Sequence, residues 1–228
     1  IKRDLKRYAV AGIVPEILDL KYLFIETNSK VYYNTNLAPS ASFVSTKVQR
    51  DLTAYAESSE LNKYGARFKY SRFLKVIDSS HESVTSNITT VEMRRDLRLA
   101  ISEVAEYAID FGNEFHVQSM SGYNIRSSAF RVLNINTDVY LYDTPDSTGE
   151  KGQISLFSLD EGSSTPVIQR RNIGVIDYKK GRITLDPINI VSGKTKDNVD
   201  ILEISATPES NDIIGLQDLY LQLDSSFV

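Results

Sequence analysis

Two histidines are the residues best suited to acid–base or metal chemistry in this sequence, because imidazole titrates near neutral pH and binds transition metals. His81 is followed directly by Glu82, and His116 lies far along the chain, so neither has a partner at metal-ligand spacing. The sequence contains no cysteine, which removes disulfides, thiolate metal sites and cysteine nucleophiles. We therefore expect surface or capping histidines, no metal and no cofactor.

A group of carboxylates is the next candidate for chemistry. Asp143, Asp146 and Glu150 lie around a proline and a glycine, an arrangement that suggests a calcium loop. Their spacing differs from that of an EF-hand, in which oxygen ligands recur at alternate loop positions. The sequence therefore favours a solvated hairpin tip, both here and at residues 197–200. A hydrolase with two distant carboxylates stays open as an alternative, since such a pair leaves no local motif.

Motifs for common catalytic and binding functions are absent from the sequence. It has no Walker loop, no nucleotide-type G-x-G-x-x-G and no G-x-S-x-G. A net charge of −4 implies no broad basic surface for nucleic acid, and no apolar run approaches the ~20 residues of a membrane helix. Arg94, Arg95 and Arg98 suit an acidic partner, but a solvated strand edge is the more ordinary place for such charges. The sequence therefore contains no catalytic signature, and we expect neither nucleic acid nor membrane as a partner.

The first half of the chain predicts a strand, two helices and a strand. Residues 17–33 read as a long strand, and either Ser40 or Ser42 can cap the helix that follows. An apolar stripe then runs to about residue 57, formed by Val44, Val48, Leu52, Tyr55 and Ala56. A second helix starts near Arg67, ends at residues 78–80, and has its apolar face at Tyr70, Phe73, Leu74 and Ile77.

A strand completes this half, with three apolar residues on one side, Val91, Met93 and Leu97. Residues 99–117 fit either a helix or a strand. From Gly122 onward short strands alternate with turns, among them a hairpin whose loop ends in Gly181. Pro187 is expected to end the strand that follows this hairpin.

The predicted fold class is α+β. Two helices between two strands favour a strand–helix–helix–strand α/β sandwich, and about six short strands favour a mainly antiparallel β domain after it. We place the first domain at residues 1–98 and the second, β-rich domain at residues 99–228. The chain begins with Ile1 instead of methionine, which suggests a fragment or a processed product.

Three stretches of the sequence together resemble a known family. They are YAVAGIVPEILDLKYLFIETNSKVYYN from residue 8, RFKYSRFLKVIDSSHESVTSNITTVEMRRDL from residue 67 and IGVIDYKKGRITLDPINI from residue 173. Their order and spacing are similar to those of the baseplate wedge proteins of T-even-type contractile phages, within the wider baseplate J-like family. The resemblance spans most of the chain and fits the C-terminal part of such proteins.

The resemblance implies a structural role without enzymatic activity. Proteins of this kind form the inner ring of the tail baseplate, pair as homodimers and link neighbouring wedges around the tail tube. They contact other wedge proteins and hub-proximal proteins, and they rearrange when the sheath contracts. The implied location is the virion tail baseplate, with assembly in the host cytoplasm.

Two apolar stretches are candidate interface segments, although core packing is the more common role of such residues. Their members are Ile213, Ile214, Leu216, Leu219, Tyr220, Leu221, Phe68 and Tyr70. The alternative function is a carbohydrate- or receptor-binding module of a virion, because a β-rich half with many tyrosines suits an exposed aromatic platform.

Overall fold

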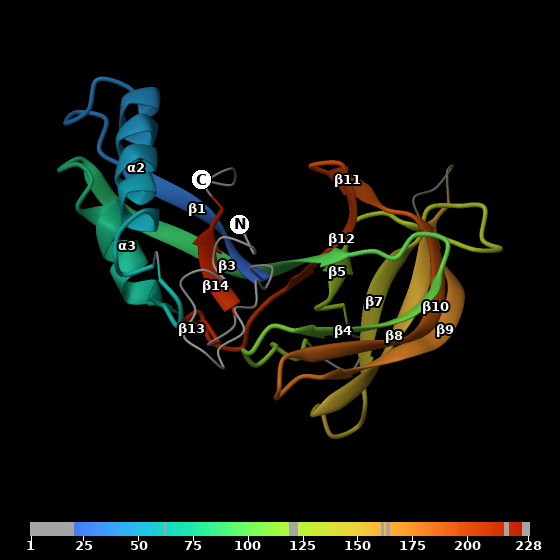
Figure 1. The fold of residues 1–228 in the computed structure, drawn as a ribbon. Helices are drawn as coiled ribbons and strands as arrows, with labels where there is room; N and C mark the ends of the chain where they lie inside the picture. The colour runs from blue at the N-terminus through green and yellow to red at the C-terminus, as the bar shows by residue number, and fades with distance from the viewer. Residues whose placement is uncertain are drawn as a thin grey trace, which may run out of the picture.

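The computed structural model describes residues 21–61, 63–118, 123–160, 162, 165–216 and 219–224, which contain two large open β-sheets, one two-stranded sheet and two helices (Figure 1). The first half contains β1 (Lys21–Tyr33), α2 (Ala41–Ala56), β2 (Arg67–Phe68), α3 (Tyr70–Asp78) and β3 (Val84–Arg98). Further strands follow in the order β4 (Val104–Asp110), β5 (Arg126–Ser127), β6 (Arg131–Val132), β7 (Tyr140–Pro145), β8 (Lys151–Leu159) and β9 (Pro166–Asp177). The last strands are β10 (Arg182–Ser192), β11 (Lys194–Lys196), β12 (Val199–Ala206), β13 (Ile213–Ile214) and β14 (Leu219–Leu223).

The first sheet combines strands from both ends of the described chain. Its order is β11-β12-β3-β1-β14, and β5 also pairs with β12. β3 pairs antiparallel with both β1 and β12, whereas β14 pairs parallel with β1. Figure 1 shows the red β14 beside the blue β1. The predicted domain division at residue 98 stays a prediction, and this sheet takes strands from both sides of it.

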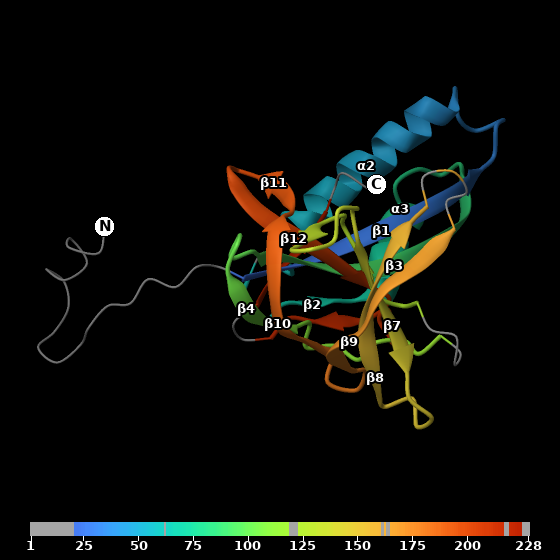
Figure 2. The same cartoon turned by 90° about the vertical axis from the view of Figure 1, so that its right-hand side faces the viewer.

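The second sheet has the order β4-β10-β9-β8-β7, with β6 paired to β10, and all of these neighbours are antiparallel. It lies at the opposite end of the molecule from the helices in Figure 1, and Figure 2 shows β8 and β9 side by side. The hairpin predicted around Gly181 is confirmed as the connection between β9 and β10. Gly181 has φ +62°, and an added Cβ would lie 1.9 Å from the carbonyl oxygen of Asn113, so only glycine fits there.

The two helices follow the predicted patterns closely. Ser40 caps α2, because its Oγ accepts a hydrogen bond from the backbone N–H of Phe43 at 3.2 Å. The buried side of α2 consists of Val44, Val48, Leu52 and Tyr55. Phe73 and Ile77 are the buried residues of α3. These side chains join Leu23, Ile25, Val91 and Met93 in one hydrophobic core.

Several predictions need correction. The described part is mainly β, so the α+β class fits only loosely. The second helix begins at Tyr70, because the two residues before Lys69 form β2 and pair with β13. The ambiguous residues 99–117 contain β4. Pro187 does not end its strand, since β10 continues to Ser192 and accommodates the missing N–H at a bulge between Leu185 and Ile188. Residues 17–20 of the first predicted strand lie outside the described residues.

Arg94 is the clearest departure from the predicted solvated strand face. Only 6% of its surface is exposed, because its guanidinium lies among carboxylates of four strands or their ends. It donates hydrogen bonds to Glu26, Asp96 and Asp224, the last at 2.6 Å, and lies 3.5 Å from Glu203. Two lysines extend the cluster, Lys194 to Glu203 and Lys196 to Asp96.

Burial and charge act in opposite directions within this Arg94 cluster. Burial lowers the pKa of Arg94, but its carboxylate partners Asp96, Glu26 and Asp224 together raise it by more, so the arginine stays charged. Burial raises the pKa of Glu26, and the hydrogen bond and charge of Arg94 offset only part of that rise. The cluster ties β1, β3 and β12 to Asp224, the residue that follows β14.

Tyr178 is buried beside Asp143 in the second sheet and supplies a prediction at alkaline pH. Its hydroxyl donates to Asp143 Oδ2 at 2.7 Å, and the other carboxylate oxygen accepts from the N–H of Ile125. Burial, then the hydrogen bond to Asp143, raises the pKa of Tyr178. Because this pKa is higher in the folded than in the unfolded chain, the stability it provides is complete below pH ~10 and is lost above it.

We expect Tyr178→Phe to lower the free energy of unfolding by about 1.5–3 kcal/mol at pH 7, since it removes a hydrogen bond to a buried carboxylate. The difference between the two proteins is expected to shrink as the pH rises above ~10. Urea unfolding at pH 7, 9 and 10.5 measures both effects. Tyr64→Phe is the control, because Tyr64 is 59% exposed. A constant difference across the pH series would contradict this role of Tyr178.

Candidate functional site

The residues considered for catalysis do not come together in the structure. His81 Nδ1 interacts with Ser83 Oγ at 2.8 Å in the turn after α3, and exposed His116 pairs with Glu209. No group of His, Asp and Glu suitable for a metal occurs among the described residues. His116 is thus the expected surface histidine, whereas His81 is partly buried and its Nδ1 accepts a hydrogen bond from the backbone N–H of Ser83 at 3.2 Å.

The carboxylates of the calcium alternative are also separate. Asp143 is buried against Tyr178, whereas Glu150 pairs with Lys179 at 2.5 Å. Asp146 accepts hydrogen bonds from Thr148 and from the N–H of Gly149 in the turn between β7 and β8. The hydrogen bond from Thr148 is the main cause of the lowered pKa of Asp146. The predicted solvated hairpin tip is confirmed for Asp146 and Glu150, whereas it is wrong for Asp143, which is only 1% exposed.

The candidate interface residues divide into buried and exposed groups. Phe68, Ile213, Leu219 and Leu221 are at most 2% exposed and belong to the core. Ile214 and Leu216 are exposed, and Tyr220 and Tyr70 are partly exposed. The structure brings most of them together, since β13 pairs with β2 and Tyr220 forms a bridge with Tyr64. Whether the exposed residues form an interface stays a prediction.

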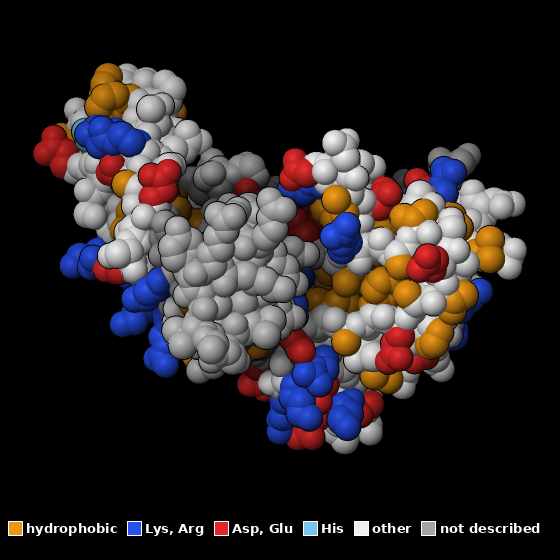
Figure 3. All heavy atoms as spheres, viewed as in Figure 1, with side chains coloured by type: hydrophobic (Ala, Val, Ile, Leu, Met, Phe, Trp, Pro, Cys, Tyr) orange, Lys and Arg blue, Asp and Glu red, His pale blue; other side chains and the backbone are white. Residues whose placement is uncertain are grey.

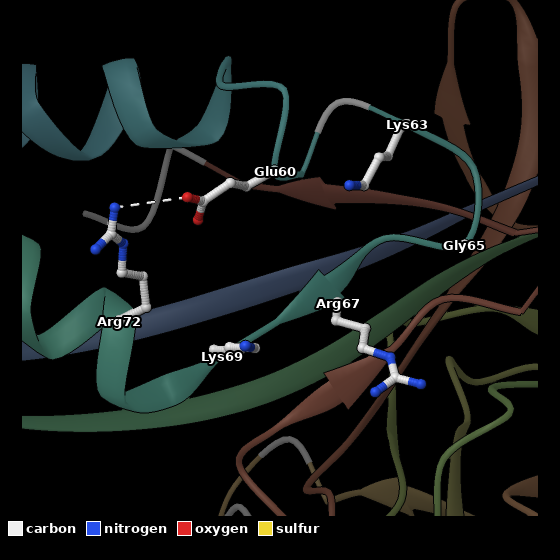
Figure 4. Close-up of a pocket in the computed structure, with 6 residues that line it drawn as sticks. All are labelled: Glu60, Lys63, Gly65, Arg67, Lys69 and Arg72. Atoms are coloured by element: carbon white, nitrogen blue, oxygen red, sulfur yellow. Dashed lines mark ion pairs between the residues drawn. The ribbon is translucent and has the colours of Figure 1, made fainter.

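A basic pocket lies between the loop after α2 and the start of α3 (Figure 4). We define it by its lining residues, Glu60, Lys63, Gly65, Arg67, Lys69 and Arg72, which surround a volume of about 560 Å³. Arg72 Nη2 lies 3.5 Å from Glu60 Oε1, and about half of each side chain is exposed. Figure 3 shows lysine and arginine side chains gathered along the edge of the molecule below the helices.

The backbone around Arg67 is fixed by hydrogen bonds to β13 and to Gly215. Phe68 and Arg67 of β2 pair with Ile213 and Ile214 of β13, and Gly215 N–H donates to Ala66 O at 2.8 Å. Phe68 is fully buried and packs against Phe73, with the two ring centroids 5.4 Å apart. Arg67 therefore extends from a paired strand and Lys69 from the N-cap of α3, on either side of the buried Phe68.

The start of α3 has unfavourable charges for helix stability. Lys69 is the N-cap and makes no side-chain capping hydrogen bond, and the first turn contains no acidic residue. Arg72 adds a second cation there, although the partial charge of a helix N-terminus is positive and such cations cost about 0.3–1 kcal/mol each. The N–H of Tyr70 is capped from elsewhere, by Asp212 Oδ1 at 2.8 Å.

Lys69→Ser is therefore expected to stabilise the protein by about 0.5–1 kcal/mol, because serine caps a helix and the change removes a cation from its positive end. The extended backbone of Lys69, with φ −102° and ψ 112°, suits a capping residue. Thermal unfolding of both proteins measures the change. Lys69→Ala is the control and lacks a capping oxygen. Equal midpoints for the serine and alanine variants would contradict the capping argument.

A second hollow lies over the β7–β8 end of the second sheet and has an aromatic lining. It encloses about 490 Å³, and its aromatic members are Tyr123, Tyr140, Tyr142 and Phe157. The ring centroids of Tyr140 and Phe157 are 5.4 Å apart, and those of Tyr123 and Tyr142 are 5.5 Å apart. We call this hollow the aromatic groove. Figure 3 shows exposed hydrophobic side chains over this half of the molecule.

Known proteins resemble this chain in the half that carries the basic pocket. The family described as "Baseplate structural protein gp6, C-terminal domain III" matches residues 21–96. This range covers β1, α2, β2, α3 and most of β3. The pocket residues all lie within it.

A curated relative extends the similarity. The chain is 29% identical over 148 residues to "Baseplate wedge protein gp6" of Enterobacteria phage T4, a match that covers 63% of the chain and 22% of the relative. The chain thus spans about a fifth of the length of this relative. Both findings support the resemblance to a phage baseplate wedge protein family, whose name describes a structural protein, not an enzyme. Neither names the wider baseplate J-like family, which stays a prediction.

Sequence reasoning missed the basic pocket, because its cations are spread over a loop, a strand and a helix. The signal that was available is local: Lys63, Arg67, Lys69 and Arg72 follow each other within ten residues with only Glu60 close by.

No helix in the described part of the chain is long and apolar enough to cross a membrane.

Proposed function

We propose that the chain is a structural subunit of a contractile phage tail baseplate. In this proposal it helps form the inner ring, pairs as a homodimer and links neighbouring wedges around the tail tube. The match of residues 21–96 to the baseplate family carries the proposal.

The proposed partners are a second copy of the chain, other wedge proteins and hub-proximal proteins, without nucleic acid or membrane. The proposed location is the virion tail baseplate, after assembly in the host cytoplasm. A closed ring requires each subunit to offer two rigid contact surfaces, and paired strands are suited to this. Rearrangement on sheath contraction is part of the proposal. The proposal also includes a baseplate J-like domain at residues 1–98.

Light scattering behind a sizing column tests homodimer formation. The exposed candidates Ile214 and Leu216, at 47% and 37% exposure, adjoin β14, an edge strand of the first sheet. The proposal predicts a mass that rises toward a dimer with concentration, and a shift back to monomer in Ile214→Asp. Ile88→Asp is the matched control, since Ile88 is 62% exposed in β3. A monomer at every concentration would contradict self-pairing by this chain.

A second candidate function rests on the aromatic groove. Tyrosine rings around a hollow favour a carbohydrate- or receptor-binding module, because sugars stack on exposed aromatic faces. A glycan array with the unaltered chain and with Tyr123→Ala tests this candidate. Tyr123 is 59% exposed, so its removal should leave the fold intact. Binding that disappears in the variant would favour this function over a purely structural one.

A further inference from the structure

The basic pocket has an excess of positive charge on a chain whose net charge is −4. Lys63, Arg67 and Lys69 form no ion pair within the described residues, and Arg72 has the single carboxylate of Glu60 at 3.5 Å. Figure 4 shows these side chains coming from the loop after α2, from β2 and from the start of α3, with Arg67 pointing away from Glu60 and Arg72. Concentrated like charge around a concave surface raises the local concentration of anions.

This charge is not explained by the stability of the fold. The cations Lys69 and Arg72 stand at the positive end of α3, where acidic side chains are favoured. The strand that presents Arg67 is fixed by its pairing with β13, and Lys69 follows this strand directly as the N-cap of α3, so the pocket exists before any ligand binds. A preformed site loses less conformational entropy when it binds.

We propose that the basic pocket binds a carboxylate-rich peptide segment of a partner protein. Its volume of about 560 Å³ accommodates several side chains, and its cations are distributed around the hollow instead of converging on one point. A segment with spaced Asp and Glu residues matches this distribution. The proposal does not depend on the baseplate assignment, since it rests on the pocket alone.

Two features favour a peptide over nucleic acid. None of the lining residues is aromatic, so bases would find no ring on which to stack. Glu60 and Asp212 lie at the pocket and at the adjoining helix start, where they would repel a phosphate backbone with its continuous negative charge. A peptide can place a neutral residue beside them.

Fluorescence anisotropy with a labelled peptide in which glutamate alternates with glycine tests the proposal at low and moderate salt. We expect saturable binding that weakens as salt screens the charges, and a loss of about tenfold or more in affinity in the double variant Arg67→Gln/Lys69→Gln. The matched control is Lys75→Gln/Lys151→Gln, which removes two exposed lysines outside the pocket. Its affinity is expected to stay within about twofold of the unaltered chain.

Lys69→Ser provides a variant that keeps its fold, because it is expected to unfold at a higher temperature while it binds the peptide more weakly. Equal peptide affinity in the pocket variants and the control would overturn the proposal. Tighter binding of a six-nucleotide single-stranded DNA, lost in the same variants, would overturn it in favour of nucleic acid. Displacement of the peptide by inorganic phosphate at low millimolar concentration would overturn it in favour of a simple anion site. Light scattering of the chain alone is unaffected by these outcomes, so the homodimer proposal stands or fails separately.

Discussion

Replacing Arg94 by methionine is expected to destabilise the protein by about 3–5 kcal/mol, because it leaves buried carboxylates without their cation. The guanidinium contacts Glu26, Asp96 and Asp224, from β1, β3 and the end of β14. It also lies 4.3 Å from the centre of the Phe24 ring. Loss of the guanidinium therefore weakens the contacts between neighbouring strands of the first sheet. Urea unfolding at pH 7 measures the resulting decrease in the free energy of unfolding.

Two comparisons make the Arg94 result specific. Arg98→Met is the control, because Arg98 is exposed at the end of the same strand and its loss should change stability by no more than about 0.5 kcal/mol. Lowering the pH should reduce the difference in free energy of unfolding between Arg94→Met and the unaltered chain, because protonated carboxylates carry no charge that a cation must balance. The pKa of Glu26 is already raised by burial, so it takes up its proton first. An equal decrease in the free energy of unfolding for Arg94→Met and Arg98→Met would contradict the stabilising role of the Arg94 cluster.

Phe68→Ala is the second large effect, with an expected loss of about 3–5 kcal/mol of stability from the cavity that a buried phenylalanine leaves. Phe68 is 0% exposed, pairs with Ile213 and contacts Phe73. If Phe68 were an interface residue, its replacement would instead lower association and leave the free energy of unfolding of the monomer unchanged. Urea unfolding and light scattering of the same variant separate the two roles.

Ile214→Ala is the matched control for Phe68. It lies beside Ile213 in the same short strand but is 47% exposed, so we expect a change within about 0.5 kcal/mol in stability. Similar stability losses for the two variants would show that the division into buried and exposed candidates is wrong.

Local signals predicted the local structure well. The serine cap and apolar stripe of α2, the polar stop after α3 and the glycine of the β9–β10 hairpin all depend on neighbouring residues. The short pairing of β2 with β13 joins segments far apart in the chain, and no local pattern specifies it. For the same reason the second helix was predicted to start too early.

The sites were predicted less well than the elements. Arg94 looked like one of several charges on a solvated strand, and its burial depends on Glu203 and Asp224, which are distant in sequence. The aromatic groove likewise combines Tyr123 with Phe157 and Ile168 across several strands. Alternation of side chains along a strand predicts two faces, but it does not reveal what the rest of the chain places against them.

Immunogold labelling of virions, with antibodies raised against residues 21–224, tests the proposed baseplate role most directly. The account predicts gold particles at the tip of the tail, at the baseplate, in virions of the phage that encodes this chain. Antibodies absorbed with the purified chain serve as the control and should leave the tail tip unlabelled. Labelling confined to the capsid, or virions that contain no trace of the chain by mass spectrometry, would contradict a structural role in the baseplate.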